Sequence, residues 1–170
     1  FVYICDNGWV QNLNNRSYNK NSKRSPFDYG MRTPIIFKWK GKIEPKMDTT
    51  TLVTSLDMVP TVLDILAIEK PGNVQGVSVL DYTTLNSREA IFGEIYAHDF
   101  STIDSSLFYK IAYTNPYKLI VPDIKNKPKE AIKLFNIYQD PYEQKNLANE
   151  KPEVVQALIE KLEQQWVNYN

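Results

Sequence analysis

The stretch Phe1-Val2-Tyr3-Ile4-Cys5-Asp6-Asn7-Gly8 opens the chain with five apolar residues and ends in a polar turn sequence. The apolar run is rich in β-branched and aromatic residues, which is typical of a strand buried on both faces of a parallel sheet. A protein rarely begins inside a buried strand, so we expect this chain of 170 residues to be a fragment. Cys5 is the single cysteine, which excludes a disulfide framework and indicates a buried structural thiol.

A second strand and a helix are predicted downstream of this stretch. Residues 34–39 (Pro-Ile-Ile-Phe-Lys-Trp) have the composition of a strand, with the proline at its start. Asp57 is the expected N-cap of a helix that ends near residue 68. Apolar residues recur there at helical spacing and predict a buried stripe: Leu56, Val59, Leu63 and Leu66. The order strand, loop, strand, helix predicts an α/β layer structure.

The sequence changes character near residue 87. Four short strand candidates follow at close spacing, as in an antiparallel meander: residues 90–96, 108–113, 117–121 and 133–137. A final helix is predicted from Pro152 to about Val167, with an apolar stripe of Val155, Leu158, Ile159, Leu162 and Trp166. We therefore predict two parts, residues 1–87 as an incomplete α/β sheet domain and residues 88–170 as a small antiparallel sheet packed with a C-terminal helix.

The charge balance narrows the choice of partners. The net charge is zero, with 20 basic and 20 acidic residues, but residues 13–46 hold nine basic residues and only two acidic ones. This segment either forms a positive field suited to an anionic ligand or is a solvated basic face. Nucleic acid is not expected, because the aromatic residues lie in or beside apolar runs. No apolar run approaches the roughly 20 residues that cross a bilayer, so no membrane span is expected.

Asp6, Asn7 and Lys23 are the residues that could take part in chemistry. Asp6 and Asn7 follow the first strand and offer two hard oxygen donors, which suit Ca²⁺ or Mg²⁺ better than zinc. Asp-Asn-Gly is equally a ready-made tight turn. Lys23 could stabilise negative charge on a transferring oxyanion, or it is a surface lysine. His98, the only histidine, fits a surface or packing role on its residue type alone.

The order of several short motifs resembles the sulfatase family of the alkaline-phosphatase superfamily. The family has a strand ending in Asp-Asn-Gly, as at residues 6–8, and then a fixed pattern that is matched here by Lys23, Phe27, Asp28, Gly30, Arg32 and Pro34. Its later motifs resemble Asp57-x-x-Pro60-Thr61, Gly76-x-Ser78, the strand at residues 91–94 and the closing stretch at residues 134–148. The resemblance covers the chain almost end to end and is to the C-terminal portion of a bacterial-type sulfatase.

The resemblance implies roles for individual residues. It makes Asp6 and Asn7 two ligands of an active-site Ca²⁺, ahead of Mg²⁺, and it makes Lys23 a contact to the substrate sulfate. It places His98 at the edge of the substrate pocket. We expect Asp28 and Arg32 to fix the loop that presents Lys23. Tyr29 departs from the family pattern, which commonly has a second glycine there.

The resemblance implies that the residue that attacks the substrate is not in this chain. Family members use a formylglycine made from Cys or Ser in a Cys/Ser-x-Pro/Ala-x-Arg motif, which this sequence lacks. The resemblance places that motif, further acidic ligands and a catalytic histidine earlier in the parent protein. With two metal ligands and no nucleophile, this chain alone is expected to bind Ca²⁺ weakly and to catalyse nothing.

The expected function of the parent is hydrolysis of sulfate esters, with a sulfated small molecule or carbohydrate as substrate. The resemblance suggests a periplasmic or secreted parent. Two alternatives stay open: a phosphodiesterase or phosphonate hydrolase of the same superfamily, and a non-catalytic binding or structural fragment. A fragment that exposes half a sheet is also able to associate with itself through the exposed edge or apolar face.

Overall fold

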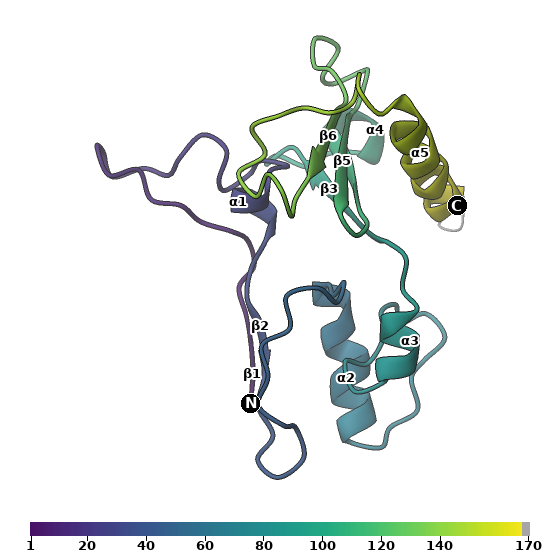
Figure 1. Ribbon diagram of the computed structural model, residues 1–170. Coiled ribbons are helices and arrows are strands. Elements are labelled where there is room, and N and C mark those ends of the chain that lie inside the picture. Colours follow the sequence, from purple (N-terminus) through teal and green to yellow (C-terminus); the bar gives the residue numbers. More distant parts are fainter. Residues whose placement is uncertain (168–170) are drawn as a thin grey trace. The chain divides into compact units, whose positions relative to one another are not determined.

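The computed structural model describes residues 1–167, with side chains up to residue 165 (Figure 1). These residues form two compact units. Unit 1 contains residues 1–5 and 34–91, and unit 2 contains residues 6–33 together with the chain from Phe92 onward. The segment 6–33 therefore leaves unit 1 after its first strand, joins the C-terminal residues, and returns. No helix in the described part is long and apolar enough to cross a membrane.

Unit 1 begins with a two-stranded sheet. Strand β1 (Val2–Ile4) pairs antiparallel with β2 (Ile35–Phe37), with Val2 opposite Phe37 and Ile4 opposite Ile35. The side chains of Tyr3 and Ile36 are 44% and 48% exposed. Both strands were predicted, but burial on both faces in a parallel sheet was not found in this chain. Within residues 1–167, β1 and β2 pair only with each other, so each strand keeps one edge free, and the face that carries Tyr3 and Ile36 is exposed.

The helical part of unit 1 is a short 3₁₀ turn, η1 (Ser55–Asp57), followed by α2 (Met58–Ile65) and α3 (Tyr82–Asn86). The cap is Thr54, whose side chain accepts from Leu56 N, and Asp57 closes a capping box onto Thr54 N. Asp57 was expected to be the N-cap, but its carboxylate makes no capping bond to α2. The helix ends earlier than predicted, since Ala67 adopts a left-handed conformation with φ 54°.

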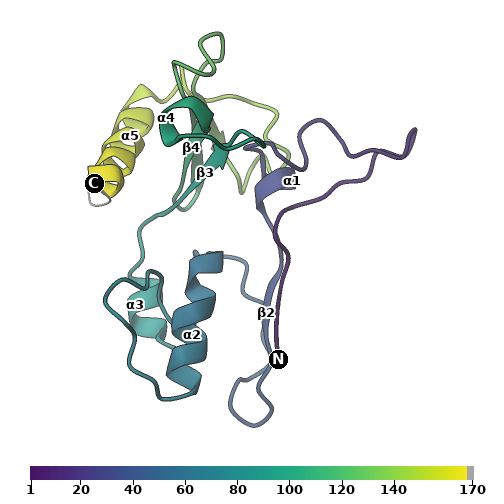
Figure 2. The same cartoon turned by 180° about the vertical axis from the view of Figure 1, so that it is seen from behind.

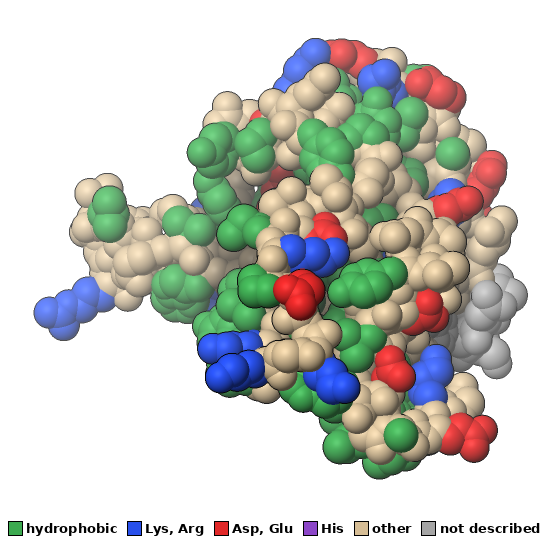
Figure 3. Space-filling view, turned by 60° about the horizontal axis from the view of Figure 1, so that its bottom comes forward, with side chains coloured by type: hydrophobic (Ala, Val, Ile, Leu, Met, Phe, Trp, Pro, Cys, Tyr) green, Lys and Arg blue, Asp and Glu red, His purple; other side chains and the backbone are tan. Residues whose placement is uncertain are grey.

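The predicted apolar stripe of α2 is not its buried face. Leu56, Val59 and Leu66 are 51%, 53% and 60% exposed, while Asp57, Pro60 and Thr61 are buried. Figure 3, which is turned so that the lower part of Figure 1 comes forward, shows hydrophobic side chains at the surface. Helical periodicity located this helix correctly, but polar anchoring decides which face is turned inward.

Asp57 is the anchor of unit 1. Its carboxylate accepts two hydrogen bonds of 2.8 Å from the Arg88 guanidinium, one of 2.8 Å from Val77 N and one of 2.8 Å from Thr54 N. Burial alone would raise the pKa of Asp57, but the hydrogen bonds from Arg88 and from the two amides outweigh it and hold the pKa below its ordinary value. The carboxylate therefore stays ionised and ties the start of α2 to residues 77 and 88.

The turn at residues 76–78 is built around the same helix. Gly76 has φ 85°, and a side chain there would lie 2.4 Å from the Leu56 carbonyl oxygen, so only glycine fits. Ser78 Oγ donates to Asp64 at 2.6 Å, and the Thr61 hydroxyl accepts from Val79 N at 2.9 Å. The segments that carry the Asp-x-x-Pro-Thr and Gly-x-Ser motifs are thus hydrogen-bonded to each other.

Unit 2 is built on a four-stranded sheet in the order β3 (Ile91–Tyr96), β4 (Leu107–Tyr113), β5 (Tyr117–Pro122) and β6 (Lys133–Asn136). The pairs β4–β5 and β5–β6 are antiparallel. The predicted meander is confirmed, and each strand lies within a residue or two of its expected range. A short turn joins β4 to β5, whereas the helix α4 (Ile103–Ser106) lies between β3 and β4.

The two faces of this sheet are covered by different parts of the chain (Figures 1 and 2). On one face α5 (Pro152–Val167) packs Leu158 and Leu162 against Ala112, Leu119 and Leu134. The C-terminal helix and its stripe are thus confirmed up to Leu162, while the side chain of Trp166 lies outside the described residues. The other face is formed by buried Tyr109, Ile111, Ile120 and Phe135, and residues Phe27 and Met31 around α1 (Asp28–Met31) pack on it. The segment 6–33 is therefore part of the core of unit 2.

We predict that Arg88→Met destabilises unit 1 by about 3–5 kcal/mol, because it leaves the buried Asp57 carboxylate without its cation. Urea unfolding near neutral pH measures this loss. A carboxyl pKa that is depressed by folding contributes stability above the unfolded-state value of about 3.9, and this contribution is lost as the pH falls through the folded-state pKa. The difference between variant and wild type should therefore shrink below about pH 4.

Lys46→Met is the matched control, since its ion pair with Asp48 is largely exposed and should contribute under about 1 kcal/mol. Equal losses for the two variants would contradict the anchoring role of Asp57.

Candidate functional site

Asp6, Asn7 and Lys23 all lie in unit 2, on the segment 6–33. The beginning of this segment is fixed to its end, because Gly8 N donates to the Gly30 carbonyl oxygen at 2.8 Å. A Cβ on Gly8 would lie 2.3 Å from the Tyr29 carbonyl oxygen, so the close approach requires glycine. A second link runs from Val10 N to the buried Ser22 hydroxyl at 2.6 Å. Gly8 and Ser22, the residues next to Asn7 and Lys23, are thus each held by a hydrogen bond within the segment 6–33.

Asp6 and Asn7 each present an oxygen atom that accepts no hydrogen bond from the described residues 1–167. Asp6 is exposed, and one of its carboxylate oxygens accepts from Asn7 N at 3.0 Å. Asn7 Nδ2 donates to the Gly8 carbonyl oxygen at 2.8 Å, which leaves Asn7 Oδ1 as an unused acceptor. One carboxylate oxygen and one amide oxygen are the hard donors that Ca²⁺ prefers. The donor set at this position therefore fits a calcium ion, although the two residues do not form a complete coordination shell.

No group of three or more His, Cys, Asp or Glu side chains within residues 1–167 is placed to hold a metal ion. A dication held by Asp6 and Asn7 would need further ligands from elsewhere.

Lys23 is half-buried and is held by an aromatic side chain. Its ammonium nitrogen lies 5.7 Å from the centre of the Trp9 ring, and Trp9 in turn packs on Tyr18 with ring centres 5.1 Å apart. A cation over an indole face is stabilised without the loss of its charge. Among the described residues Lys23 has no carboxylate partner. Its charge is therefore available to an anionic ligand.

The segment 6–33 is attached to the sheet through a buried ionic cluster, defined by Asp28, Lys118, Glu143 and Tyr113. Lys118 Nζ lies 2.8 Å from Asp28 Oδ1 and 2.6 Å from Glu143 Oε1, and the lysine is fully buried. The Tyr113 hydroxyl donates to Asp28 Oδ1 at 2.7 Å. Asp28 N donates to Glu143 Oε2 at 2.6 Å, so the start of α1 is fixed by both charge and backbone.

Burial and charge shift the pKa values within this ionic cluster. Burial raises the pKa of Glu143 above its ordinary value, against the opposing effect of the Lys118 charge. Burial and the neighbouring Asp28 carboxylate raise the pKa of the Tyr113 hydroxyl well above its ordinary value. Tyr113 is therefore a permanent hydrogen-bond donor. Arg32 adds little, since it is mostly exposed and lies 3.9 Å from Asp28. The expected structural role is carried by Asp28 much more than by Arg32.

His98 lies apart from these contacts in the sequence, just after β3, and it is exposed. The residues around it form a small aromatic and acidic group. Tyr96 packs edge-on against Phe100 with ring centres 5.4 Å apart, and its hydroxyl donates to Glu94. Burial and Glu94 raise the pKa of Tyr96 to about 12. The structure gives His98 no bond to Asp6, Asn7 or Lys23, and its role in a substrate pocket stays a prediction.

The sequence analysis assigned no role to Lys118 or Glu143. The signal for Lys118 was a charged residue inside the apolar strand at residues 117–121, where its side chain must enter the core or leave it. The signal for Glu143 was its place in the Asp-Pro-x-Glu motif, which was used for the resemblance alone. Their pairing with Asp28, 90 and 115 residues away, could not be derived without the fold.

We predict that Lys118→Met destabilises unit 2 by about 3–5 kcal/mol at neutral pH, because two buried carboxylates lose their cation. Without Lys118 the pKa of Glu143 rises further. A carboxyl pKa that folding raises contributes stability below the unfolded-state value of about 4.3, and this contribution is lost as the pH rises through the folded-state pKa. Urea unfolding should therefore show a smaller deficit near pH 5 than near pH 7.

Lys145→Met removes an exposed ion pair with Glu150 and is the control, with an expected loss under about 1 kcal/mol at either pH. A Lys118→Met deficit that did not depend on pH would contradict the carboxylate explanation.

Comparison with known proteins identifies the relatives of this chain. Residues 17–168 match the family described as N-sulphoglucosamine sulphohydrolase, C-terminal. Arylsulfatase K of Xenopus laevis is 25% identical over 167 residues, which cover 95% of this chain and 30% of that protein. The chain thus spans about 30% of the length of the curated relatives that it matches. These relatives include animal and bacterial proteins, so the similarity does not assign a source.

Solved structures share the fold. An enzyme in complex with its substrate D-glucosamine-2-N,6-O-disulfate aligns with a TM-score of 0.70 at 21% identity, over 99% of this chain and 34% of that chain. The phosphonate monoester hydrolase of Agrobacterium radiobacter aligns with a TM-score of 0.51 at 17% identity, over 67% of this chain and 25% of that chain. At these identities the likeness concerns the fold alone. The family match over residues 17–168 decides between the two classes, and the chain belongs to the sulfatase family as a C-terminal portion of such a protein.

Proposed function

We propose that the protein containing this chain hydrolyses sulfate esters of carbohydrates, and that the chain supplies two calcium ligands and one sulfate-binding lysine. The observation that carries the proposal is the construction of the segment 6–33. Asp6 and Asn7 begin it and Lys23 lies further along it, and Gly8–Gly30 and Val10–Ser22 hydrogen bonds hold it together. A site made of these residues would be fixed as one piece on the sheet of unit 2.

Asp6 and Asn7 would hold Ca²⁺ through the free carboxylate oxygen and Asn7 Oδ1. When bound, a dication of this kind polarises the sulfate group and lowers the energy of the negative charge that develops on it. The contribution of this chain is to hold the two oxygens ready. The Asn7 amide is already turned so that its nitrogen is engaged with Gly8 and its oxygen is free.

Lys23 would pair with a sulfate oxygen and stabilise the transition-state charge. Trp9 holds the ammonium without neutralising it, which suits a group that must meet an anion. The ionic cluster around Asp28 keeps α1, and with it the loop that carries Lys23, attached to the sheet. The attacking formylglycine and the remaining metal ligands would come from the other part of the protein.

Several observations favour a sulfated carbohydrate as substrate. The family takes its description from N-sulphoglucosamine sulphohydrolase, and one structural neighbour has a disulfated glucosamine as its substrate. The excess of basic residues in positions 13–46 suits an anionic substrate. His98 would line the pocket for this substrate. A periplasmic or secreted location and self-association of the isolated chain remain proposals of the same kind.

We predict that Lys23→Ala in the full-length protein lowers kcat for an aryl sulfate by about 10²–10³-fold, the usual cost of removing one group that stabilises transition-state charge. Sulfate release measures this effect. Lys42→Ala, an exposed lysine on unit 1, is the control and should leave kcat unchanged. Faster turnover of a phenylphosphonate ester than of the aryl sulfate would favour the phosphonate hydrolase alternative, and no turnover of either ester would favour a non-catalytic protein.

We predict that the chain alone binds Ca²⁺ weakly, with a dissociation constant of about 1 mM, because two protein ligands are too few for a tight site. A ¹H–¹⁵N NMR titration should shift the signals of Asp6, Asn7 and Gly8. Asp6→Asn should weaken binding about tenfold, whereas Asp104→Asn, another exposed aspartate, should not. Shifts spread over exposed carboxylates without preference for residues 6–8 would contradict the assignment.

A further inference from the structure

Asn7-Gly8 is the one Asn-Gly pair in the 170 residues of the sequence. In a flexible chain such a pair is chemically labile, because the backbone nitrogen after an asparagine can attack the side-chain amide, and glycine has no side chain that hinders the attack. A labile asparagine thus stands at a position whose amide oxygen the proposed function assigns to calcium.

The reaction at Asn7 is an intramolecular acyl transfer followed by hydrolysis. The Gly8 nitrogen forms a bond to Asn7 Cγ, and the bond from Cγ to Nδ2 breaks. The amide nitrogen leaves as ammonia after taking up the proton that the Gly8 nitrogen loses. Solvent water then opens the five-membered imide at either carbonyl group and gives aspartate or isoaspartate at position 7. Water is the only co-reactant.

The Gly8 nitrogen is engaged elsewhere in the structure. Gly8 is buried, and its N–H donates to the Gly30 carbonyl oxygen at 2.8 Å. The Asn7 amide is held as well, since Asn7 Nδ2 donates to the Gly8 carbonyl oxygen at 2.8 Å. To react, the Gly8 nitrogen must leave Gly30, lose its proton and approach Asn7 Cγ. The closed Gly8–Gly30 hydrogen bond therefore blocks the reaction.

The Gly8–Gly30 hydrogen bond depends on how the segment 6–33 is attached to the sheet. Gly30 belongs to α1, and the first residue of this helix, Asp28, is bound to Lys118 at 2.8 Å and to Glu143 at 2.6 Å. These contacts fix the backbone that Gly8 approaches. A change that loosens the ionic cluster should therefore also loosen the partner of the Gly8 nitrogen.

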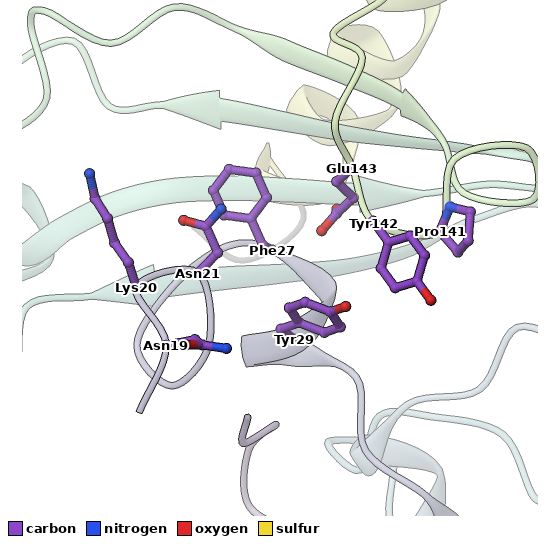
Figure 4. A pocket seen from close by; sticks show the side chains of 8 residues that line it. All are labelled: Asn19, Lys20, Asn21, Phe27, Tyr29, Pro141, Tyr142 and Glu143. Carbon is purple, nitrogen blue, oxygen red and sulfur yellow. The ribbon is translucent and has the colours of Figure 1, made fainter. Parts of the chain in front are cut away.

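Two aromatic contacts add to this attachment. Phe27 packs on Phe135 of the sheet with ring centres 6.0 Å apart, and Tyr29 meets Tyr142 edge to face with ring centres 6.2 Å apart. Figure 4 looks into the pocket of about 310 Å³ that Phe27, Tyr29 and Tyr142 help to line, and it shows Tyr29 next to Tyr142. The backbone on either side of Asp28 is thus packed against other parts of unit 2.

We propose that Asn7 is a deamidation site and that opening of the Gly8–Gly30 hydrogen bond sets the rate of its reaction. Attachment of the segment 6–33 to the sheet thereby protects Asn7. Deamidation adds a negative charge at residue 7, and the isoaspartate product also adds one carbon atom to the main chain. Either product alters the pair of oxygen donors that the proposed function assigns to calcium. The protection itself requires neither calcium nor substrate.

Mass spectrometry of the complete chain, incubated in mildly alkaline buffer with EDTA, tests this inference. Peptide mapping separates Asn7 from its products, and the chain unfolded in urea gives the unprotected rate. Asn7 should react at least about tenfold more slowly in the folded chain than in the unfolded chain. Hydrogen exchange of the Gly8 amide requires the same opening, so its protection factor should agree with that of the deamidation within about threefold.

Two variants loosen the attachment without removing a charge. Tyr113→Phe deletes the hydrogen bond of 2.7 Å to Asp28 and should speed the reaction at Asn7 about fivefold. Tyr142→Ala deletes the ring contact with Tyr29 and should act in the same direction, by about twofold. The second variant keeps the test decisive if the first loses the spectrum of a folded chain.

Lys145→Met is the matched control, because it removes only an exposed ion pair and should leave the rate at Asn7 unchanged. Asn86, which precedes Ser87 in unit 1, is an internal control whose rate should not respond to Tyr113→Phe. Equal rates for Asn7 in the folded and unfolded chains would overturn the inference, and so would slow deamidation beside a freely exchanging Gly8 amide. Both outcomes would leave the proposed function standing, because neither calcium nor substrate is present.

Discussion

The buried Lys118 ammonium is the point on which the arrangement of unit 2 depends. It lies between the carboxylates of Asp28 and Glu143, which come from a loop helix and from the stretch before the C-terminal helix. A fully buried lysine is tolerated only where its charge is compensated, so the fold forms as a whole only when all three segments meet. Hydrophobic contacts of Phe27 and Met31 with the sheet add area, but the ion pairs fix where α1 begins.

A second ionic contact has the same design in unit 1. The Arg88 guanidinium meets the Asp57 carboxylate in a two-point contact, and the remaining lone pairs of Asp57 accept from the backbone at Val77 and Thr54. Directional polar contacts of this kind compensate for what a short helix and a two-stranded sheet lack in apolar burial. They also explain why α2 turns Asp57 and Thr61 inward and leaves Leu56 and Val59 exposed.

The local structure of unit 2 could be predicted from the sequence because each strand and the final helix have their own apolar period. Both strands of the two-stranded sheet in unit 1 were predicted, but their exposure was not. An apolar run does not reveal how many neighbouring strands it pairs with. The buried face of α2 was not predicted, because helical periodicity considers apolar residues alone and Asp57 is a buried carboxylate. Pairings such as Asp28 with Lys118 depend on the tertiary fold and leave no local signal.

The residues that carry the family resemblance differ in whether their polar side-chain atoms are bonded within the chain. Asp28, Asp57 and Glu143 lie in shared motifs, but each carboxylate is paired with a cation within the chain, Asp28 and Glu143 with Lys118 and Asp57 with Arg88. Asp6 and Asn7 each keep an oxygen free, and Lys23 has only an aromatic neighbour. A buried polar group must be satisfied for the fold to be stable, whereas a group that serves a ligand must be left unsatisfied until the ligand arrives. By this criterion the first three residues are structural, whereas Asp6, Asn7 and Lys23 keep the polar groups that the proposed calcium ion and sulfate would use.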